Sequence, residues 1–280
     1  MKIATIKNNN REEAAVIIND LLVSIDSINK QFQFNWSTNL FDLINNRQLG
    51  QIKGWLDSNV KFDNLTPIEN INFAPPFRRP GKIWGIGLNY VEHANDLSES
   101  VPVFEPASFM KPFTTIIGHN EKIVLPKLSE KVTGEAELGI IIGKECKNVE
   151  RENWLDVVAG FTCVLDMTAE DILRKNPRYL TLSKSFDTFF SFGPIIYTPD
   201  EFDDILNIEV ATILNGNFIA KNIIKNMTFK PDYLVSFHSK IMTLLPGDII
   251  STGTPRATKI INGNKIECKI SGMYPLKNKV

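Results

Sequence analysis

The sequence predicts a β-rich α+β fold with a small N-terminal α+β domain. Segments with strand character outnumber helical ones and do not alternate regularly with them, which disfavours a doubly wound parallel sheet. A proline-rich segment at residues 73–80 interrupts both patterns and is typical of a linker. We therefore expect a small domain at residues 1–72 and a larger domain at residues 81–280.

The composition is that of an ordinary globular protein. With 280 residues, of which 43% are hydrophobic and 22% charged, the chain can bury a sizeable core. The formal net charge is −1 and there is no basic stripe, so neither nucleic acid nor a membrane is expected as a partner. No apolar run approaches the ~20 residues of a membrane span, and the first residues lack a signal-peptide pattern. Three cysteines without a CxxC pair fit a reducing compartment, so we expect a cytoplasmic protein.

In the first domain, two apolar runs predict a hairpin. Ala14–Asn19 and Leu21–Ile25 meet at Asn19-Asp20, a favourable turn sequence. Because the runs do not alternate cleanly, a helix over Glu12–Ile28 is an open alternative. The other elements expected here are a strand over Lys2–Lys7 and helices over Asn39–Ile44 and Gln48–Asn59.

In the second domain, strands predominate. Short apolar runs bounded by turn residues predict the strands, and helical spacing predicts the helices. The expected strands are Lys82–Gly87, Thr114–Gly118, Glu135–Ile142, Phe161–Asp166, Pro194–Tyr197, Ile208–Leu214, Phe218–Ile224, Asp248–Ser251 and Lys265–Ile270, and the expected helices are Asn89–Leu97, Trp154–Ala159, Ala169–Leu173 and Pro231–Met242.

Two acids stand one residue apart at the start of the apolar strand within Gly134–Gly143. Glu135 and Glu137 point to the same face of a strand, about 6–7 Å apart. Two like charges beside an apolar strand are costly unless a cation lies between them, and a divalent metal would meet this need. Two acids on a solvated strand end, balanced by Lys131 and Lys144, remain an equally open interpretation.

A third acid, Asp166, ends the apolar run that begins at Phe161. An acid at this position is often only the N-cap of the next helix. Alternatively, Asp166 faces Glu135 and Glu137, and three carboxylates suit Mg²⁺, Mn²⁺ or Ca²⁺ better than zinc, which prefers His and Cys. The chain has only three histidines, widely spaced, which disfavours a histidine-rich site.

Three further segments have both a functional and a purely structural interpretation. Helical spacing puts Asp96 on the same face as His93, where a carboxylate could orient an imidazole that activates water, or the histidine could simply lie on a solvated helix. Lys184 could stabilise an oxyanion or be a surface lysine packed along Phe186. The Gly-Thr-Pro bend could be ordinary turn chemistry or could present Thr254 donors to an anionic substrate.

Several common catalytic motifs are absent from the sequence. Gly85 and Gly87 follow a strand, but the third glycine of a dinucleotide fingerprint would fall on Tyr90. There is no GxSxG elbow, Walker A loop or HExxH motif. A Rossmann enzyme, an α/β-hydrolase, a P-loop NTPase and a zincin are therefore disfavoured.

Taken together, the ordered segments resemble the fumarylacetoacetate hydrolase family. The match runs from about Pro80 to Val280, and residues 1–70 are similar to the small N-terminal domain of many members. The resemblance implies a mixed β-sandwich roll, usually in a homodimer, with the site at the mouth of the roll. Its landmarks are GLNYVEHA, FMKP, EAELGIIIGK, GFTCVLDMTAED, KSFDTFFSFGP, LNG and LPGDIISTGTP.

The resemblance also implies a site and a chemistry. The family acts on small 2-oxo acids and 1,3-dicarbonyls, by hydrolysis of C–C bonds, decarboxylation or isomerisation. It implies Mg²⁺ or Mn²⁺, sometimes Ca²⁺, as the cofactor. The residues that it implies are Glu135, Glu137 and Asp166 as metal ligands, His93, Asp96 and Lys184 as catalytic residues, and Thr254, Tyr90 and Asp187 as substrate-binding residues.

The chain departs from the family pattern around this site. Asp96 stands where the carboxylate of the dyad is usually Glu. Such departures indicate an atypical substrate or reaction. The others are Leu165, Glu170 and Leu173 in place of a frequent Asn, Arg and Gln, Ala220, Ile223 and Ile224 in place of polar residues, and Arg256-Ala257-Thr258 in place of a Gly-rich turn.

We therefore expect a divalent-metal-dependent hydrolase that cleaves a C–C bond in a small acylpyruvate or 1,3-dicarbonyl substrate. One alternative is a metal-dependent decarboxylase or tautomerase of a 2-oxo acid, and another is a catalytically silent metal-binding homologue. Water attack needs a competent His–carboxylate pair, whereas decarboxylation needs mainly the metal.

Overall fold

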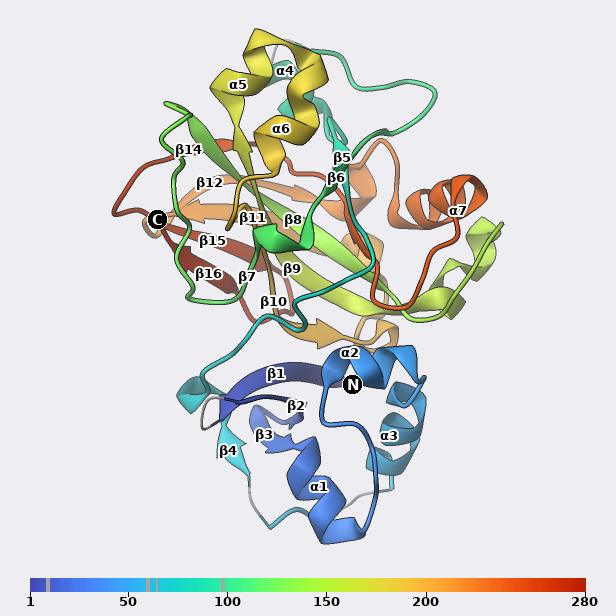
Figure 1. Cartoon of the computed structure of the whole chain (residues 1–280). Coiled ribbons are helices and arrows are strands. Elements are labelled where there is room, and N and C mark those ends of the chain that lie inside the picture. The colour runs from blue at the N-terminus through green and yellow to red at the C-terminus, as the bar shows by residue number, and fades with distance from the viewer. Residues whose placement is uncertain (9–10, 59–60, 64, 97–98) are drawn as a thin grey trace.

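A computed structural model of the chain describes residues 1–280 except residues 9–10, 59–60, 64 and 97–98. The side chain of Asp96 also lies outside the described part. Figure 1 shows a small N-terminal part below a larger C-terminal part. Strands form two sheets and helices are short, so the predicted β-rich mixed fold is confirmed. Among the described residues, no helix combines the length and the apolar character that a bilayer span requires.

The predicted N-terminal hairpin is confirmed. β1 (Lys2–Asn8) pairs with β2 (Arg11–Ile18), which pairs with β3 (Leu21–Ser24) across a turn at Asn19-Asp20. Both turn residues have positive φ, 49° and 62°, as the type I′ turn of a tight hairpin requires. The alternative helix over Glu12–Ile28 is wrong.

The apolar runs of the hairpin fail to alternate because both faces of β2 are covered. Ala15 and Ile17 belong to the apolar cluster that fills the C-terminal part, whereas Ala14 and Val16 belong to the cluster under the N-terminal helices. A strand buried on both faces gives a continuous apolar run, which periodicity alone cannot distinguish from a helix.

Three short helices pack on the hairpin. Ser24 caps the first by accepting a hydrogen bond from the backbone N–H of Ser27, and Asn39 caps the second through the N–H of Asp42. Aromatic rings gather around Trp55 between the helices. The helices are α1 (Ile25–Phe32), α2 (Leu40–Asn45) and α3 (Leu49–Leu56), and the end of the predicted helix at Asn59 lies outside the described residues.

The larger sheet runs through both parts of the protein. β1 pairs antiparallel with β10 (Phe190–Tyr197), and Lys2 lies opposite Tyr197. The proline-rich segment passes beside this pairing, where the carbonyl of Pro76 accepts a hydrogen bond from Thr5 Oγ1 at 2.7 Å. One hydrogen-bonded sheet therefore connects the two parts, and the domain boundaries at residues 72 and 81 stay a prediction.

Two long antiparallel strands, β8 (Val132–Ile142) and β9 (Val158–Ala169), form the centre of this sheet. Every residue of both strands is buried. β9 pairs with β10 on its other side, and β8 pairs with β13. The remaining strands of the sheet are β13 (Ile249–Ser251), β5 (Ile83–Gly87), β6 (Ala107–Lys111), β4 (Thr66–Pro67), β7 (Ile116–Ile117) and β14 (Thr258–Ile260).

A second sheet packs on one face of β8. A Cβ atom at Gly134 would lie 2.4 Å from Cδ1 of Ile266, so a larger residue there would displace the end of that side chain. Ala136 and Leu138 belong to the same apolar cluster as Ile266. Because side chains alternate, the odd-numbered residues of β8 point to the opposite face. The second sheet consists of β12 (Asn217–Ile223), β11 (Glu209–Leu214), β15 (Lys265–Ile270) and β16 (Leu276–Lys279).

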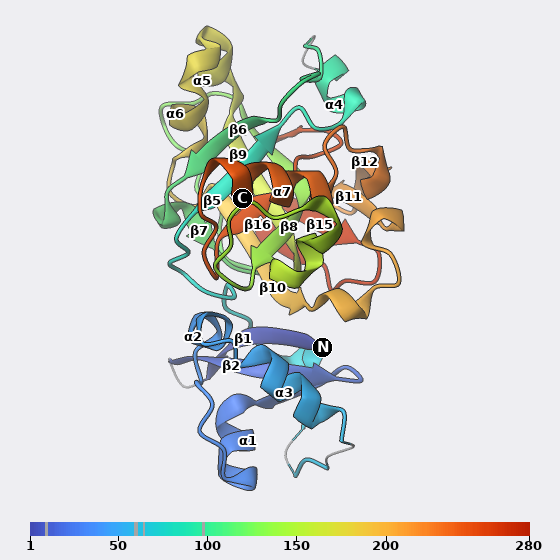
Figure 2. The same ribbon diagram turned by 90° about the vertical axis from the view of Figure 1, so that its right-hand side faces the viewer.

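Three helices gather at one end of the C-terminal part, as both ribbon views show (Figures 1 and 2). A fourth helix packs against a 3₁₀ segment at Arg151–Val157. The predicted helix over Trp154–Ala159 is confirmed only as a 3₁₀ helix as far as Val157, and its end is wrong. The carbonyl of Val157 accepts a hydrogen bond from the N–H of Gly143, and β9 begins at the next residue. The helices are α4 (Val91–Asp96), α5 (Glu170–Lys175), α6 (Leu180–Lys184) and, packed on the 3₁₀ segment, α7 (Pro231–Ile241).

The sequence analysis missed several short elements, namely α1, α6, β4, β6, β14 and β16. β16 shows why, since three of its four residues, Leu-Lys-Asn-Lys, are charged or polar and it carries no apolar run. Its two buried positions, Leu276 and Asn278, alternate with two exposed lysines. A strand of four residues gives too few repeats of this pattern to be recognised.

Leu138→Ala should lower the free energy of unfolding by about 2–5 kcal/mol, because the fully buried Leu138 fills the space between the two sheets and its truncation leaves a cavity. Urea denaturation measures this difference. Leu128→Ala is the matched control, since Leu128 is 76% exposed and its loss should change the free energy by no more than about 0.5 kcal/mol. Similar small effects at both positions would contradict the packing described.

Candidate metal centre

The register of β8 and β9 brings three carboxylates together in the middle of the large sheet. Glu135 lies opposite Asp166, and Glu137 follows two residues later on the same face of β8. One oxygen from each carboxylate lies within 4.8 Å of the other two. Glu135 is 7% exposed, Glu137 1% and Asp166 0%, so the interpretation of a solvated strand end is wrong. We call these three residues the acidic cluster.

Hydrogen bonds orient the carboxylates of the acidic cluster. Thr168 Oγ1 donates to Glu135 Oε1 at 2.7 Å. The Oε2 atom of Glu137 accepts from Ser251 Oγ at 2.5 Å and from the backbone N–H of Gly253 at 2.8 Å. The end of β13 and the following bend therefore hold Glu137 in place. Sequence reasoning missed this contact, although the LPGDIISTGTP landmark contains Ser251.

Two buried lysines also face the acidic cluster. Nζ of Lys184, at the end of α6, donates to Asp166 Oδ2 at 2.7 Å and to Glu135 Oε2 at 3.3 Å. Nζ of Lys111, at the end of β6, donates to the other carboxylate oxygen of Asp166 and to the carbonyl of Met167 at 3.1 Å. Sequence reasoning identified Lys184 and missed Lys111, although the FMKP landmark contains it.

Burial shifts the pKa values of the charged groups in and around the acidic cluster. Burial, and then repulsion from Asp166 and Glu135, raises the pKa of Glu137 to about 8. Burial lowers the pKa of Lys111 to about 8. Burial alone would raise the pKa of Asp166, but Lys111 and Lys184 hold it below its usual range. Three carboxyl groups thus face two ammonium groups, so Glu137 has no cation of its own in the cluster to balance its ionised form.

The donors of the acidic cluster fit a hard divalent cation. All three are carboxylates, which Mg²⁺, Mn²⁺ and Ca²⁺ prefer, and no cysteine or histidine belongs to the group. A divalent cation would offset the unbalanced carboxylate and would favour the ionised form of Glu137, whose pKa burial otherwise raises. The cluster is therefore able to bind a divalent metal.

The predicted catalytic pair lies on α4. His93 is buried, and α4 lies at the same end of the protein as α5 and α6 in both ribbon views (Figures 1 and 2). The side chain of Asp96 lies outside the described part of the chain. The pairing of His93 with Asp96 therefore stays a prediction.

The predicted substrate-binding residues differ in their surroundings. Tyr90 is fully buried, and its hydroxyl has no hydrogen-bond partner among the described residues. Burial, and then the nearby Glu137, raises the pKa of Tyr90. Thr254 is buried and its Oγ1 donates to the carbonyl of Arg256 at 3.1 Å, whereas Asp187 is exposed in the turn before β10. Their roles toward a substrate stay predictions.

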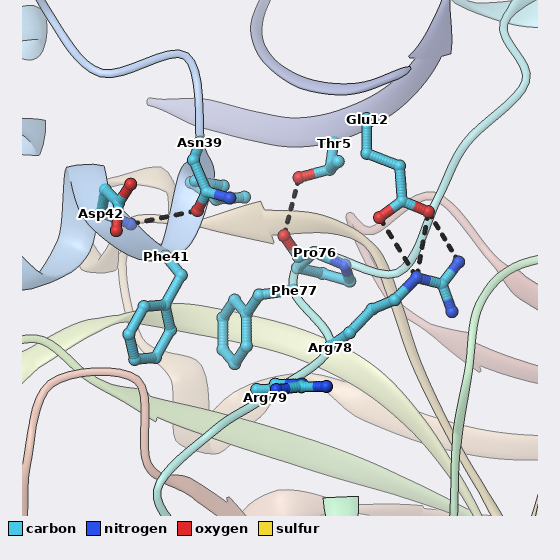
Figure 3. Close-up of a pocket in the computed structure, with 10 residues that line it drawn as sticks. Thr5, Glu12, Asn39, Phe41, Asp42, Pro76, Phe77, Arg78 and Arg79 are labelled. Atoms are coloured by element: carbon cyan, nitrogen blue, oxygen red, sulfur yellow. Dashed lines mark hydrogen bonds and ion pairs between the residues drawn. The ribbon is translucent and has the colours of Figure 1, made fainter. Parts of the chain in front are cut away.

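A cavity of about 330 Å³ lies away from the acidic cluster, where the N-terminal part meets the proline-rich segment (Figure 3). The rings of Phe41 and Phe77 line it, with centroids 5.5 Å apart. Arg78 points toward Glu12, and its Nη2 lies 2.6 Å from Glu12 Oε1. None of the carboxylates or lysines described above lines this cavity, so we place the candidate site at the acidic cluster and not here.

The C-terminal part matches a known family. Residues 82–280 match the model described as "Fumarylacetoacetate (FAA) hydrolase C-terminal". The chain belongs to the fumarylacetoacetate hydrolase family. This finding confirms the resemblance of the sequence motifs and agrees with the strand-rich fold described above.

Relatives within the fumarylacetoacetate hydrolase family have different reactions in their names. The chain is 35% identical over 238 residues to the mitochondrial oxaloacetate tautomerase fahd2 of Xenopus laevis, covering 81% of this chain and 73% of that protein. It is 28% identical to a maleylpyruvate hydrolase of Sphingobium sp. SYK-6, solved with manganese(II) and pyruvate, with a TM-score of 0.81 and coverage of 100% and 98%. A 5-carboxymethyl-2-hydroxymuconate delta-isomerase of Mycobacterium smegmatis is 26% identical, with a TM-score of 0.78 and coverage of 100% and 98%. Members of the family are thus enzymes of several reaction types.

Mn²⁺ at about 100 times its dissociation constant should raise the melting temperature by roughly 5 °C, because binding to the folded state adds about 2.7 kcal/mol of stability. Asp166→Asn should abolish this shift, since it removes a buried ligand. Glu267→Gln, which alters a partly buried acid paired with Lys277 on the second sheet, should retain it. Thermal melting with and without Mn²⁺ measures the shift, and an equal shift in the Asp166 variant would contradict the assignment.

Ser251→Ala should weaken Mn²⁺ binding about 10- to 100-fold, because Glu137 loses the 2.5 Å hydrogen bond that orients its carboxylate. Calorimetric titration with Mn²⁺ measures the affinity. Ser271→Ala is the control, because Ser271 is exposed. Equal affinities in the two variants would show that Ser251 does not support the metal ligand.

Proposed function

We propose that the protein is a divalent-metal-dependent hydrolase that cleaves a C–C bond in a small acylpyruvate or 1,3-dicarbonyl substrate. The observation that carries this proposal is the acidic cluster with Lys184 and Lys111 beside it in a buried site. Membership of the family supports it, as does the full-length similarity to a maleylpyruvate hydrolase. We propose Mg²⁺ or Mn²⁺ as the cofactor, with Ca²⁺ as a further possibility.

The charges of the site suit an anionic dicarbonyl compound. A divalent cation held by the acidic cluster would supply Lewis-acid polarisation to the adjacent oxygens of a 2-oxo acid. With that cation bound, the cluster and its two lysines would carry one positive charge in excess, which a monoanionic 2-oxo acid balances. Nζ of Lys184 also lies 4.5 Å from the ring centroid of Phe109, so its charge acts in poorly solvated surroundings. A fixed cation there stabilises negative charge that develops on an attacked carbonyl.

Hydrolysis also needs a base that activates water. His93 is the proposed base, and Asp96 is the proposed carboxylate that orients it. His93 is buried on α4, three residues after Tyr90, whose pKa the nearby Glu137 helps to raise, and this supports a position near the substrate. Tyr90, Thr254 and Asp187 are the proposed substrate-binding residues, and the unpartnered hydroxyl of Tyr90 supports its assignment.

A second candidate function is tautomerisation or decarboxylation of a 2-oxo acid by the same metal site. The 35% identity to an oxaloacetate tautomerase favours it. Both reactions develop negative charge beside a metal-polarised carbonyl, but neither requires the attack of water. The third candidate is a metal-binding homologue without activity of its own. Incubation with a series of acylpyruvates and 2-oxo acids distinguishes it from both enzymes.

We also propose that the protein works as a homodimer in the cytoplasm. Large apolar side chains are exposed on the single chain, including Phe104 at 88% and Val103 at 78%. Exposed apolar side chains of this size are what a subunit interface would cover. Size-exclusion chromatography with light scattering reads the oligomeric state directly.

His93→Ala should lower the hydrolytic rate about 10²- to 10⁴-fold, because a general base contributes that much to water attack. The Mn²⁺-loaded wild-type and variant proteins are incubated with acylpyruvates, oxaloacetate and related 2-oxo acids, and the products are read by mass spectrometry. Loss of cleavage with retained Mn²⁺ binding supports the hydrolase. Undiminished turnover in the variant supports the tautomerase or decarboxylase, and inactivity of the wild type on every compound supports the silent homologue.

A further inference from the structure

The cavity beside the proline-rich segment has an aromatic lining (Figure 3). The ring of Phe41 comes from α2 and the ring of Phe77 from the proline-rich segment, and the two meet at an interplanar angle of 66°. Phe77 also contacts the ring of Phe192 on β10, with centroids 5.2 Å apart. Leu40 and Pro76 add to the apolar lining. Because aromatic rings attract further rings in edge-to-face or offset arrangements, this lining suits a ligand with a flat apolar ring.

Two polar side chains of the same cavity keep hydrogen-bond donors to spare. Oδ1 of Asn39 accepts from the backbone N–H of Asp42 at 3.2 Å, and the two N–H groups of its side-chain amide have no partner among the described residues. Arg78 donates through Nε and Nη2 to Glu12, and through Nη2 to Glu121. Its Nη1 atom makes no such bond within the described part of the chain. The cavity therefore offers donors to a ligand that accepts hydrogen bonds.

Arg79 adds a positive charge that no acid balances. Its guanidinium lies 5.4 Å from the ring centroid of Phe113, in a cation–π contact, and it forms no ion pair with any described residue. The two acids of the lining do not meet this charge, because Glu12 is paired with Arg78 and Asp42 is exposed to water that screens it. The donors of the Arg79 guanidinium can therefore bind an anion.

We propose that this cavity binds a small carboxylate with one aromatic ring, as a ligand distinct from the substrate of the acidic cluster. The ring would pack against Phe41 and Phe77, and the carboxylate would pair with Arg79, whose planar guanidinium matches two carboxylate oxygens. The volume of about 330 Å³ is near the lower end of the range for ligand sites, about 300–1,000 Å³, so one ring with a short acid group fits. We call this cavity the aryl carboxylate site.

Two matched ligands test this proposal. Phenylacetate and phenylacetamide have the same ring and nearly the same shape, and differ in the charge of the end group. In calorimetric titrations of the Mn²⁺-loaded protein, phenylacetate should bind about tenfold more tightly, because a hydrogen bond to a charged group contributes that much. Asp166→Asn removes a candidate metal ligand and should keep this preference, since a carboxylate held by the metal would lose it.

Variants of the cavity then assign the preference to its residues. Arg79→Gln should bring the ratio of the two affinities close to one. Phe41→Leu should weaken both ligands about 2- to 10-fold and leave their ratio unchanged, because it removes a ring contact and no charge. Arg47→Gln is the matched control for charge, since Arg47 is an exposed arginine just after α2 that does not line the cavity, and it should keep the wild-type ratio. Thermal melting confirms that each variant is folded.

Each outcome of these titrations decides the proposal. A preference for phenylacetate that survives Asp166→Asn and disappears in Arg79→Gln supports the aryl carboxylate site. Equal binding of the two ligands by the wild-type protein, binding of neither, or a ratio that Arg79→Gln leaves unchanged overturns it. A preference lost in Asp166→Asn places the carboxylate at the metal and also overturns it. A ratio lowered equally by Arg47→Gln shows a general charge effect, with the same consequence.

Discussion

The antiparallel pairing of β8 with β9 is the constraint on which the candidate site depends. It sets Glu135 opposite Asp166 and turns Glu137 to the same side. A shift of one residue in this register would turn the acids toward the second sheet, where Gly134 now admits the side chain of Ile266. The same close approach of the two sheets that packs the core therefore directs the acids to the opposite face. Packing and chemistry are specified by the same alternation.

The fold tolerates three buried carboxylates because other groups of the chain meet their charges. An unpaired buried charge is expensive, and several carboxylates together are more so. Lys184 and Lys111 reach Asp166 from two different elements, and Ser251 with the N–H of Gly253 supports Glu137. Glu137 nevertheless has no cation of its own in the cluster to balance its ionised form. This arrangement lowers the stability of the protein without a metal. It suits a cation site, because a bound cation supplies the missing positive charge.

The sequence allowed part of this arrangement to be predicted. Strand alternation alone was enough to place Glu135 and Glu137 on one face, because that relation is local. It left Asp166 undecided between a helix cap and a ligand, since the choice depends on which strands are neighbours. The ordered family motifs resolved this point. Lys111 and Ser251 were missed because they reach the cluster from positions 55 and 114 residues away in the chain, and neither carries a local pattern that reports such a contact.

The errors in the predicted helices and strands also come from contacts that are distant in the sequence. The helix expected over Trp154–Ala159 is replaced by a 3₁₀ segment and a strand, because pairing with β8 determines the conformation from Val158 onward. The sequence pattern of β2 fitted both a strand and a helix, because other elements cover both faces of this strand. Leu165, which the sequence analysis gave as a departure from the family pattern, belongs to the apolar cluster between the sheets, while its neighbour Asp166 points to the site. Its effect on the site is therefore indirect, through packing.

The pairing of β1 with β10 has a consequence for the N-terminal part. β10 is hydrogen-bonded to β9 on one side and to β1 on the other, and Phe190 of β10 lies directly opposite Asp166. A chain that lacked residues 1–72 would leave the backbone donors and acceptors of β10 without partners along Ile195–Tyr197. An open edge of this kind is a template for intermolecular strand addition. The N-terminal hairpin thus acts as an edge cap, and it protects from self-association a strand that lies one hydrogen-bonded step from the candidate metal ligands.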